Sequence, residues 1–370
     1  MKSKFLLRKI SIVILIAIMC SLLSACVNDS NGLEYTVNRD GKTCTITGIG
    51  QYKSKDLVIP EIIDGYKVTA IGDYAFQNTD IISFSGPDTI TRLGKSAFNN
   101  CKQLQTVSIP NGVAEIREYT FKNCENLSVV VFPKNLKTIG EEAFGYCKSI
   151  ESLVLPQGTE KIGDWAFSMC HGIKTLVIPN TVKTIGHVAF SACIQLKEVI
   201  IPDSVTWIGN FAFSACPALT SISLPASVKS IGAAPFAYNN LSSINVAPNN
   251  PVLSSIDGNL YIKEPMVFVN YACGKTENSF SIPDGVVEIA WRSFSGSSNL
   301  KTIYIPNSVE YIGEEIFLES SNIETLYYDG TIEEWNAINK NDNWNANTKS
   351  VFSIICEDAV ISMNGTVIYN

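Results

Sequence analysis

The 370-residue sequence predicts an α/β repeat solenoid, because three features recur together every 23 residues. A proline after an apolar residue recurs from Pro110 to Pro225, and a phenylalanine, usually preceded by alanine, recurs from Phe98 to Phe236. The pair Ile-Gly keeps the same interval, at Ile139, Ile162, Ile185, Ile208 and Ile231, and it returns at Ile312. This regularity indicates one structural unit repeated along the chain.

One coil, residues 173–195, shows how the unit folds. Leu176 and Ile178 alternate with period two, which is typical of a short strand with one buried face. Pro179 ends this strand because proline cannot donate to a sheet ladder. A second apolar segment leads to the Ile-Gly turn, and Phe190 follows as the large side chain of the core.

A single coil cannot bury its own apolar side, so the coils must stack. We therefore expect a parallel β-sheet on one face, with short second strands and single-turn helices or turns on the other. The composition allows a large core, since 46% of the residues are hydrophobic and 17% are charged. The net charge of −7 argues against a nucleic-acid partner, because such binding relies on basic residues that neutralise phosphates.

The first residues predict export and lipid anchoring. A basic region of Lys2, Lys4, Arg8 and Lys9 precedes an apolar run, which is typical of a secretory signal peptide. The run closes on Leu-Ser-Ala before Cys26, which resembles the bacterial lipobox, whose cysteine is acylated and becomes the first mature residue. An uncleaved N-terminal anchor is the alternative, since the run is marginally long enough to span a membrane.

The repeat departs from its period twice. Extra residues around Asp64-Gly65 are interpreted as a loop. An excess between Pro248 and Pro283 contains Asp257-Gly258, followed by two apolar segments, and predicts a strand pair inserted at the edge of the solenoid. The expected organisation is a signal peptide at 1–25, a lipidated cysteine and linker at 26–32, an N-terminal cap at 33–58, a solenoid at 59–328 with a hairpin-like insertion near 249–281, and a C-terminal cap at 329–370.

Six cysteines occupy one position in successive coils: Cys101, Cys124, Cys147, Cys170, Cys193 and Cys216. Disulfides between neighbours are one interpretation, since export permits them, and a metal site is another. Stacked side chains, however, point in parallel rather than at each other. The same column holds Thr79, Asn239, Ser297 and Ser320 elsewhere, so we expect a structural ladder of buried, reduced thiols that hydrogen-bond a turn.

No residue pattern predicts catalysis, a metal or a cofactor. The two histidines, His171 and His187, fall where other coils carry arbitrary polar residues, and no nucleophile or ligand motif accompanies them. The acidic pairs that follow Ile-Gly are interpreted as solvated turns rather than as a glycosidase pair. Alternating asparagines around Asp342 lack the glycine and glutamate of a calcium loop. We therefore predict that the protein is not an enzyme.

These coils resemble the BspA-like leucine-rich-repeat family of bacterial surface proteins. The resemblance covers roughly residues 33–350. It includes the coil pattern, the opening Gly32-Leu33-Glu34-Tyr35 and the closing segment from Tyr327 to Trp335, which is similar to that family's C-terminal cap. The resemblance implies display at the cell surface and adhesion to a host matrix protein or another bacterial cell. It brings no catalytic residues. A long regular face would also suit a glycan.

The outward positions of the first strands are the predicted partner-binding site. The fifth position of successive coils carries Val131, Val154, Val177 and Ile200, and later Tyr304 and Tyr327. A contiguous apolar stripe marks an interaction surface, whereas simple β-propensity is the alternative explanation. We expect a monomer, lipid-anchored outside the cell, that binds an extracellular macromolecule through this face. An envelope scaffold that binds the producer's own polymers is the second hypothesis, and a hydrolase or nutrient-capture protein is the third.

Overall fold

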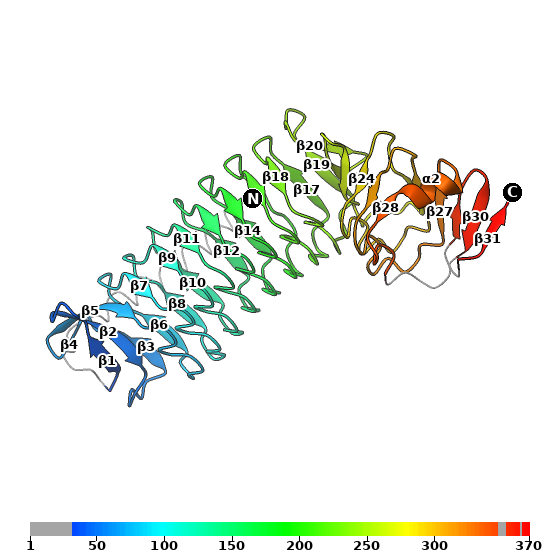
Figure 1. Ribbon diagram of the computed structural model, residues 1–370. Coiled ribbons are helices and arrows are strands. Elements are labelled where there is room, and N and C mark those ends of the chain that lie inside the picture. The colour runs from blue at the N-terminus through cyan, green and yellow to red at the C-terminus, as the bar shows by residue number, and fades with distance from the viewer. Residues whose placement is uncertain (1–31, 347–352, 363–364) are drawn as a thin grey trace, which may run out of the picture. The chain divides into compact units, whose positions relative to one another are not determined.

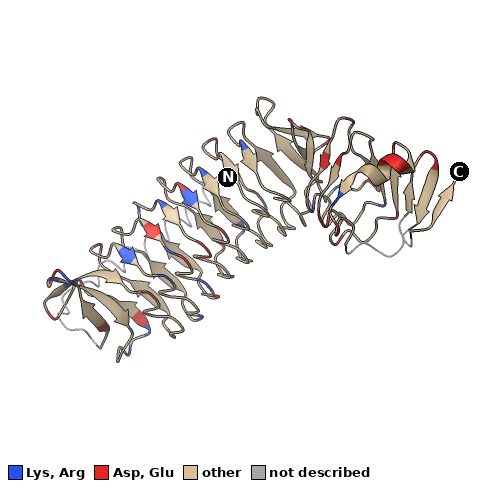
Figure 2. Cartoon of the chain, viewed as in Figure 1, with Lys and Arg blue, Asp and Glu red and all other residues tan. Residues whose placement is uncertain are grey.

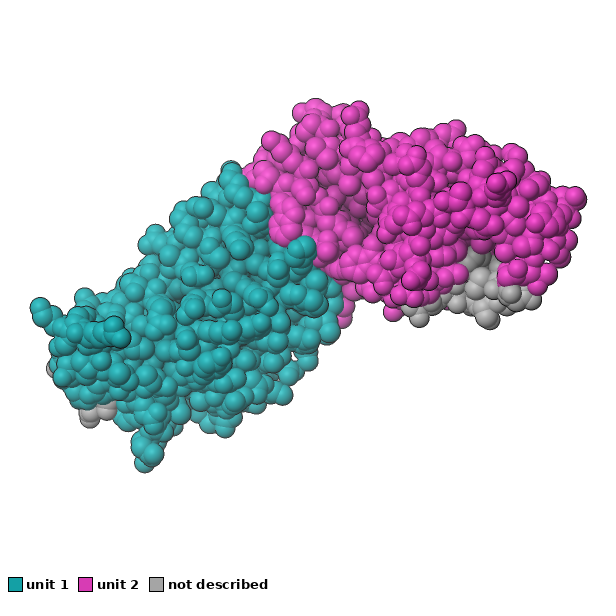
Figure 3. Space-filling model, in the orientation of Figure 1, with its two compact units in different colours: residues 1–193 teal, residues 194–370 magenta. Residues whose placement is uncertain are grey.

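A computed structural model describes residues 32–346, 353–362 and 365–370. The predicted fold class is confirmed: the chain is a parallel β-solenoid of about 12 coils with a period of about 23 residues. The described residues divide into two compact units, one that ends at Cys193 and one that begins at Ile194, which are distinguished in Figure 3. In the described residues, no helix has the length and apolar character needed to cross a membrane. The proposed signal peptide and Cys26 lie outside the described residues.

The first unit opens with a small sheet of β1 (Glu34–Val37), β2 (Thr43–Gly48), β4 (Ile62–Ile63) and β5 (Tyr66–Ile71). Strand β2 pairs antiparallel with β1 and parallel with β5. The segment interpreted as a loop is the tight turn of the β4–β5 hairpin. Asp64 and Gly65 have φ of 50° and 88°, as a two-residue hairpin turn of this hand requires.

Two sets of short strands follow along the first unit (Figure 1). The first strands of the coils are β3 (Asp56–Val58), β6 (Ser83–Ser85), β8 (Thr106–Ser108), β10 (Val129–Val131), β12 (Ser152–Val154) and β14 (Thr175–Val177). The second strands are β7 (Arg92–Leu93), β9 (Glu115–Ile116), β11 (Thr138–Ile139), β13 (Lys161–Ile162) and β15 (Thr184–Ile185). Within each set, β3–β6–β8–β10 and β12–β14 on one side and β9–β11–β13–β15 on the other pair in parallel and join equivalent residues of adjacent coils, as the repeat predicts.

The second unit repeats this plan. Its first strands are β17 (Ser221–Leu224), β19 (Ser243–Val246), β23 (Ser279–Ser281), β25 (Thr302–Ile305), β27 (Thr325–Tyr328) and β29 (Ser353–Ile355). Its second strands are β16 (Trp207–Ile208), β18 (Ser230–Ile231), β24 (Glu288–Ile289), β26 (Tyr311–Ile312) and β28 (Asn339–Lys340). Both ladders enter the segment predicted as a C-terminal cap, because β28 pairs with β26 and β29 pairs with β27.

The insertion differs from the edge hairpin that the sequence predicts. It forms three strands, β20 (Leu253–Ile256), β21 (Asn259–Ile262) and β22 (Val267–Asn270), which pair antiparallel in succession. Strand β22 then pairs parallel with β24 and so takes the place of a coil's second strand. The insertion carries large apolar side chains that an edge hairpin would leave exposed. Tyr261 and Phe268 are instead fully buried and pack into the core of this unit.

The C-terminal end carries the one helix of the described residues, α2 (Ile332–Ala337), and the antiparallel strands β30 (Ala359–Ser362) and β31 (Val367–Tyr369). Thr331 and Glu334 form a reciprocal capping box at the start of α2. Trp335 is buried against Tyr328 and Trp344. The helix therefore closes the apolar end of the last coils.

Turns, rather than single-turn helices, form the side of each coil that carries the phenylalanine. Their backbone makes a third ladder: the amide of Phe121 donates to the Ala143 carbonyl, and the amide of Phe144 donates to Ala166, both at 2.8 Å. Trp165 and Met169 have φ of 58° and 60°, and each donates its amide to the next coil at 2.8 Å. The left-handed conformation costs roughly 1–2 kcal/mol per residue, which these inter-coil bonds help to offset.

The phenylalanines stack in a column through the first unit. The ring centroids of Phe144 and Phe167 lie 5.2 Å apart, and those of Phe167 and Phe190 lie 5.4 Å apart, with nearly parallel planes. All three side chains are fully buried. Glycine lets the coils approach this closely, because a Cβ on Gly186 would lie 2.4 Å from the carbonyl carbon of Gly163.

The cysteine column lies beside the phenylalanines, inside the core. In the first unit each thiol reaches back to the phenylalanine carbonyl of the preceding coil: the Cys124 Sγ donates to Phe98 at 3.2 Å, and the Cys170 Sγ donates to Phe144 at 3.1 Å. The Ser320 hydroxyl makes the same bond to Phe294 in the second unit, at 2.6 Å. No disulfide joins the nine cysteines of the described residues.

Burial raises the pKa values of these thiols from their ordinary value of 9.0. The pKa of Cys170 is raised to about 12, and the pKa values of Cys124 and Cys147 are raised well above 9.0. Loss of hydration on burial is the main cause in all three, because it disfavours the thiolate. The column therefore has the geometry that the predicted structural ladder requires, and the reduced state of its thiols stays a prediction.

Phe167→Ala is expected to lower the free energy of unfolding by about 3–5 kcal/mol, because it removes a buried ring and leaves a cavity between two stacked neighbours. Urea unfolding followed by circular dichroism measures the change. Trp165→Ala is the matched control in the same coil, since Trp165 is partly exposed and Ala234 adopts the same left-handed conformation in another coil. Equal losses in the two variants would contradict the assigned core.

Cys170→Ser is expected to change stability by less than about 1 kcal/mol at pH 7, because a serine already makes the equivalent hydrogen bond at Ser320. A stronger effect is expected in alkali. Between pH 9 and pH 12 the unfolded chain loses thiol protons that the folded chain keeps, so stability falls as pH rises. Denaturation at a series of pH values should show a shallower fall for Cys170→Ser. An equally steep fall, or an oxidised Cys170 in the native protein, would contradict the reduced ladder.

Candidate binding surface

In the first unit, the predicted partner-binding residues lie at the ends of adjacent first strands. Val154 on β12 pairs with Val177 on β14, and their side chains are 50% and 47% exposed. The preceding residues on the two strands, Leu153 and Leu176, point inward and are buried in the core, as the alternation predicts. Val131 on β10 occupies the equivalent position but is only partly exposed, so it contributes less to the surface than the sequence predicts.

In the second unit, Ile200 is the most exposed of the predicted residues, at 72%. Its coil forms only a single bridge residue, Val199, in place of a first strand. Ile200 lines a concavity of about 450 Å³ together with residues of β17 and β19, among them Ser223 and Asn245. The surface here is an apolar side chain beside small polar groups.

Tyr304 on β25 and Tyr327 on β27 are paired in parallel register in the second unit. Their rings stack with centroids 4.9 Å apart and planes 13° apart, and the side chains are 44% and 37% exposed. Both line a second concavity, of about 430 Å³. The sequence predicts the two residues as aromatic anchors, and the structure places them side by side.

Charged residues lie mainly on the turns rather than on the strands (Figure 2). Many pair with a residue 23 positions away: the Lys137 Nζ lies 2.8 Å from Glu160, and the Lys174 Nζ lies 3.0 Å from Glu151. These pairs link adjacent coils, but their side chains are about half exposed, so each adds little stability.

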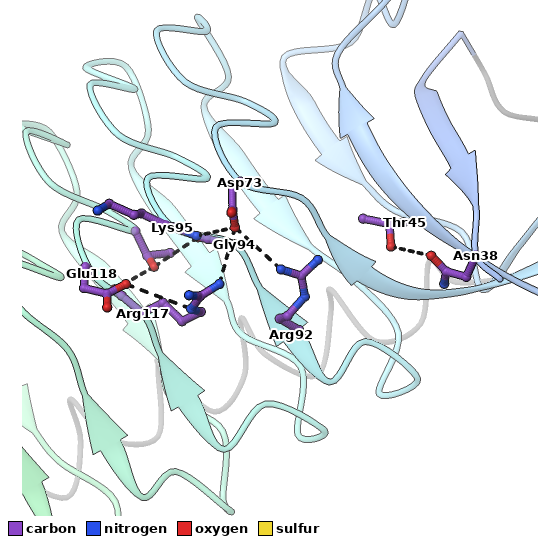
Figure 4. A network of polar contacts seen from close by, with 9 residues as sticks. Asn38, Thr45, Asp73, Arg92, Gly94, Lys95, Arg117 and Glu118 are labelled. Atoms are coloured by element: carbon purple, nitrogen blue, oxygen red, sulfur yellow. Dashed lines mark hydrogen bonds and ion pairs between the residues drawn. The ribbon is translucent and has the colours of Figure 1, made fainter. Parts of the chain in front are cut away.

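One polar network in the first unit joins three coils (Figure 4). The Asp73 carboxylate accepts the amide of Lys95 at 2.9 Å and lies 3.5 Å from Arg92 and 3.4 Å from Arg117. Asp164 accepts the amide of His187 in the same way, at 2.8 Å. An acidic residue after the glycine therefore caps the next turn, a role that sequence reasoning missed.

The remaining sequence candidates do not form a reactive site. His171 and His187 are partly exposed side chains on separate turns. Glu142 pairs with Lys122, and Glu315 pairs with Arg292 at 2.6 Å, so the acidic pairs serve contacts between coils. In the part of the chain that the structure describes, no cluster of three or more His, Cys, Asp or Glu residues could hold a metal ion.

The comparisons with known proteins agree with this architecture. The family described as the BspA type leucine rich repeat region matches in six copies, over residues 69–180, 160–277 and 268–338. A crystal structure of a leucine rich cell surface protein from Faecalibacterium prausnitzii is 25% identical, with a TM-score of 0.61, over 83% of this chain and 96% of that chain.

Two further solved structures resemble the chain. The leucine rich repeat protein of T. pallidum is 26% identical over 56% of this chain and 87% of that chain, with a TM-score of 0.46. A leucine-rich repeat protein from Bacteroides ovatus is 22% identical over 90% of this chain and 100% of that chain, with a TM-score of 0.48. No curated protein matches the sequence. Because the matched residues, 69–338, make up well over half of the sequence and carry its coil pattern, the chain belongs to the BspA-type leucine-rich-repeat family.

Proposed function

We propose that this protein is anchored at the outer face of a bacterial membrane and binds an extracellular protein or glycan through the outward face of its first strands. The carrying observation is the exposed apolar row, Val154 with Val177 in one unit and Tyr304 with Tyr327 in the other. The strands do not need large apolar side chains at this position in order to form, because Ser108 and Ser223 occupy it in other coils. β-propensity alone therefore does not account for the exposed apolar row. Membership of a leucine-rich-repeat surface family agrees with a surface and binding role.

A binding role suits the architecture better than catalysis. The sheet ladders hold the exposed rows in a fixed geometry, so little conformational entropy is lost when a partner docks. Repetition of the same position along a unit also offers several contacts to one large ligand. Among its described lining residues, the concavity at Ile200 has one carboxylate, Glu198, and no histidine or cysteine.

The lipid anchor is proposed from the sequence, since Cys26 lies outside the described residues. The small residues before Cys26 and the basic, apolar segment that precedes them support it. The Faecalibacterium relative is a cell surface protein, which is consistent with this location.

Val154→Lys and Ile200→Lys are each expected to weaken binding at least tenfold without unfolding the chain, because each puts a charge into an exposed apolar contact. Residues 27–370 would be immobilised and exposed to extracellular-matrix proteins, a glycan panel and whole bacterial cells. Circular dichroism would establish that the variants remain folded. Val154 tests the face of the first unit, and Ile200 tests the second.

Trp165→Lys and Ile194→Lys are the matched controls, since both replace exposed apolar residues on turns rather than on the strand face. Equal effects from the controls, or full affinity in both strand variants, would reject the strand face as the site. Binding only to the producer's own envelope would instead favour the scaffold hypothesis.

Cys26→Ala is expected to abolish lipid labelling, because acylation requires the cysteine thiol. Cells expressing the full chain would be fed an alkyne-labelled fatty acid, and the labelled protein would be detected after fractionation. Ser24→Ala is a control that keeps the thiol. Label retained in Cys26→Ala would overturn the proposed anchor, whereas the binding experiment above would stand independently.

A further inference from the structure

The stacked tyrosines form the most specific feature of the strand face. The pocket they line, hereafter the tyrosine pocket, contains Ser281, Asp284, Tyr304, Tyr327, Asp329 and Glu357 among its lining residues. Each ring covers one face of the other at 4.9 Å, and the backbone pairing of β25 with β27 fixes their spacing. Two rigid aromatic side chains held in this way lose little freedom on binding, which suits them as anchors.

The outer face of the Tyr304 ring has no third aromatic ring beside it. The row of outward residues across the sheet runs Ser281, Tyr304, Tyr327 and Ile355. Ile355 adjoins Tyr327, but the residue beside Tyr304 is a small, exposed serine. Adjacent strands lie about 4.8 Å apart, so a flat group above Ser281 would lie against the Tyr304 ring at stacking distance.

The pocket is acidic. Asp284, Asp329 and Glu357 are exposed and follow the ends of three first strands of this unit. Within the described residues none of these three carboxylates has an ion pair, and no lysine or arginine lines the pocket. Elsewhere, acidic side chains such as Glu315 and Glu324 are paired with a basic residue. The uncompensated charge beside two aromatic rings attracts a cation.

We infer that the tyrosine pocket binds an arginine side chain presented by a basic segment of a partner protein. This inference rests on the proposed function and names the partner class for the second unit. A guanidinium group is planar, so it can stack on Tyr304 above Ser281 while its N–H groups donate to the neighbouring carboxylates. A neutral glycan could stack on the rings and donate hydroxyl hydrogen bonds to the carboxylates, but only a cation is attracted by the net charge of all three. The net charge of −7 also favours a basic partner.

The test uses the full chain in detergent and a fluorescent peptide of alternating arginine and glycine, with binding measured by fluorescence anisotropy. A peptide with citrulline in place of arginine keeps the planar shape but removes the charge. We expect binding of the arginine peptide that weakens as salt is raised, and at least tenfold weaker binding of the citrulline peptide. Equal binding of the two peptides, or no binding of either, would overturn the inference.

Variants then locate the site. Tyr304→Ala should weaken binding of the arginine peptide at least tenfold, whereas Tyr304→Phe, which keeps the ring, should change it less than threefold. Asp284→Asn and Asp329→Asn should each weaken binding and reduce its salt dependence. Trp165→Ala and Glu310→Gln are controls that remove an exposed aromatic and an exposed carboxylate outside the pocket.

The outcomes separate this inference from the proposed function. If the controls weaken binding as much as the pocket variants do, the peptide binds by general electrostatics and the inference fails. If Tyr304→Ala removes binding to a neutral glycan while the arginine peptide never binds, the occupant is a sugar: the inference fails, and the proposed function stands. If the chain binds no extracellular protein, glycan or cell in the capture experiment, the proposed function fails, and the inference that rests on it fails as well.

Discussion

The hydrogen-bonded register between adjacent coils is the constraint on which the rest of the structure depends. Every side chain in a regular stretch lies against its own counterpart in the next coil, so a residue must pack well with copies of itself. Phenylalanine meets this condition by parallel stacking, as Phe144, Phe167 and Phe190 do at 5.2 and 5.4 Å. Glycine meets it at Gly186 because any side chain would strike the preceding coil. Cysteine meets it through a donor that reaches the preceding coil's backbone rather than its neighbouring thiol.

Much of the fold could be predicted because these requirements appear directly in the sequence as columns. The alternation of Leu176 and Ile178 correctly predicts which side chains face inward. The turn geometry could not be predicted in the same way. Tyr119, Trp165 and Met169 adopt left-handed backbone without being glycine. The cause is the inter-coil ladder that their amides complete, which involves residues of another coil. The third strand of the insertion was missed for a related reason, since β22 takes its place from its pairing with β24.

The candidate surface was predictable only in part. Strand alternation identifies Val154, Val177, Tyr304 and Tyr327 as outward residues, and their exposure agrees. The carboxylates of the tyrosine pocket do not share one position in the repeat. Asp284 lies three residues after Ser281, whereas Glu357 lies two residues after Ile355. Ile355 ends β29, the strand that joins the sheet beyond the last regular coil. Their convergence depends on how the C-terminal segment continues the ladder, which the repeat period does not determine.

A regular face and a specific site place opposite demands on a repeat protein. Identical coils present the same chemistry at each step, so a ligand that fits one position also fits the next, and its register remains undefined. Valines in successive strands can strengthen contact with a large partner, but they cannot select where it lies. A break in the pattern supplies that selection. In the second unit the outward row changes from serine to paired tyrosines within one strand spacing, and the charge around it becomes uniformly acidic. Under the proposed function, the apolar strand faces and the tyrosine pocket therefore have complementary roles: the strand faces provide contact area, and the pocket fixes the position and the class of the partner.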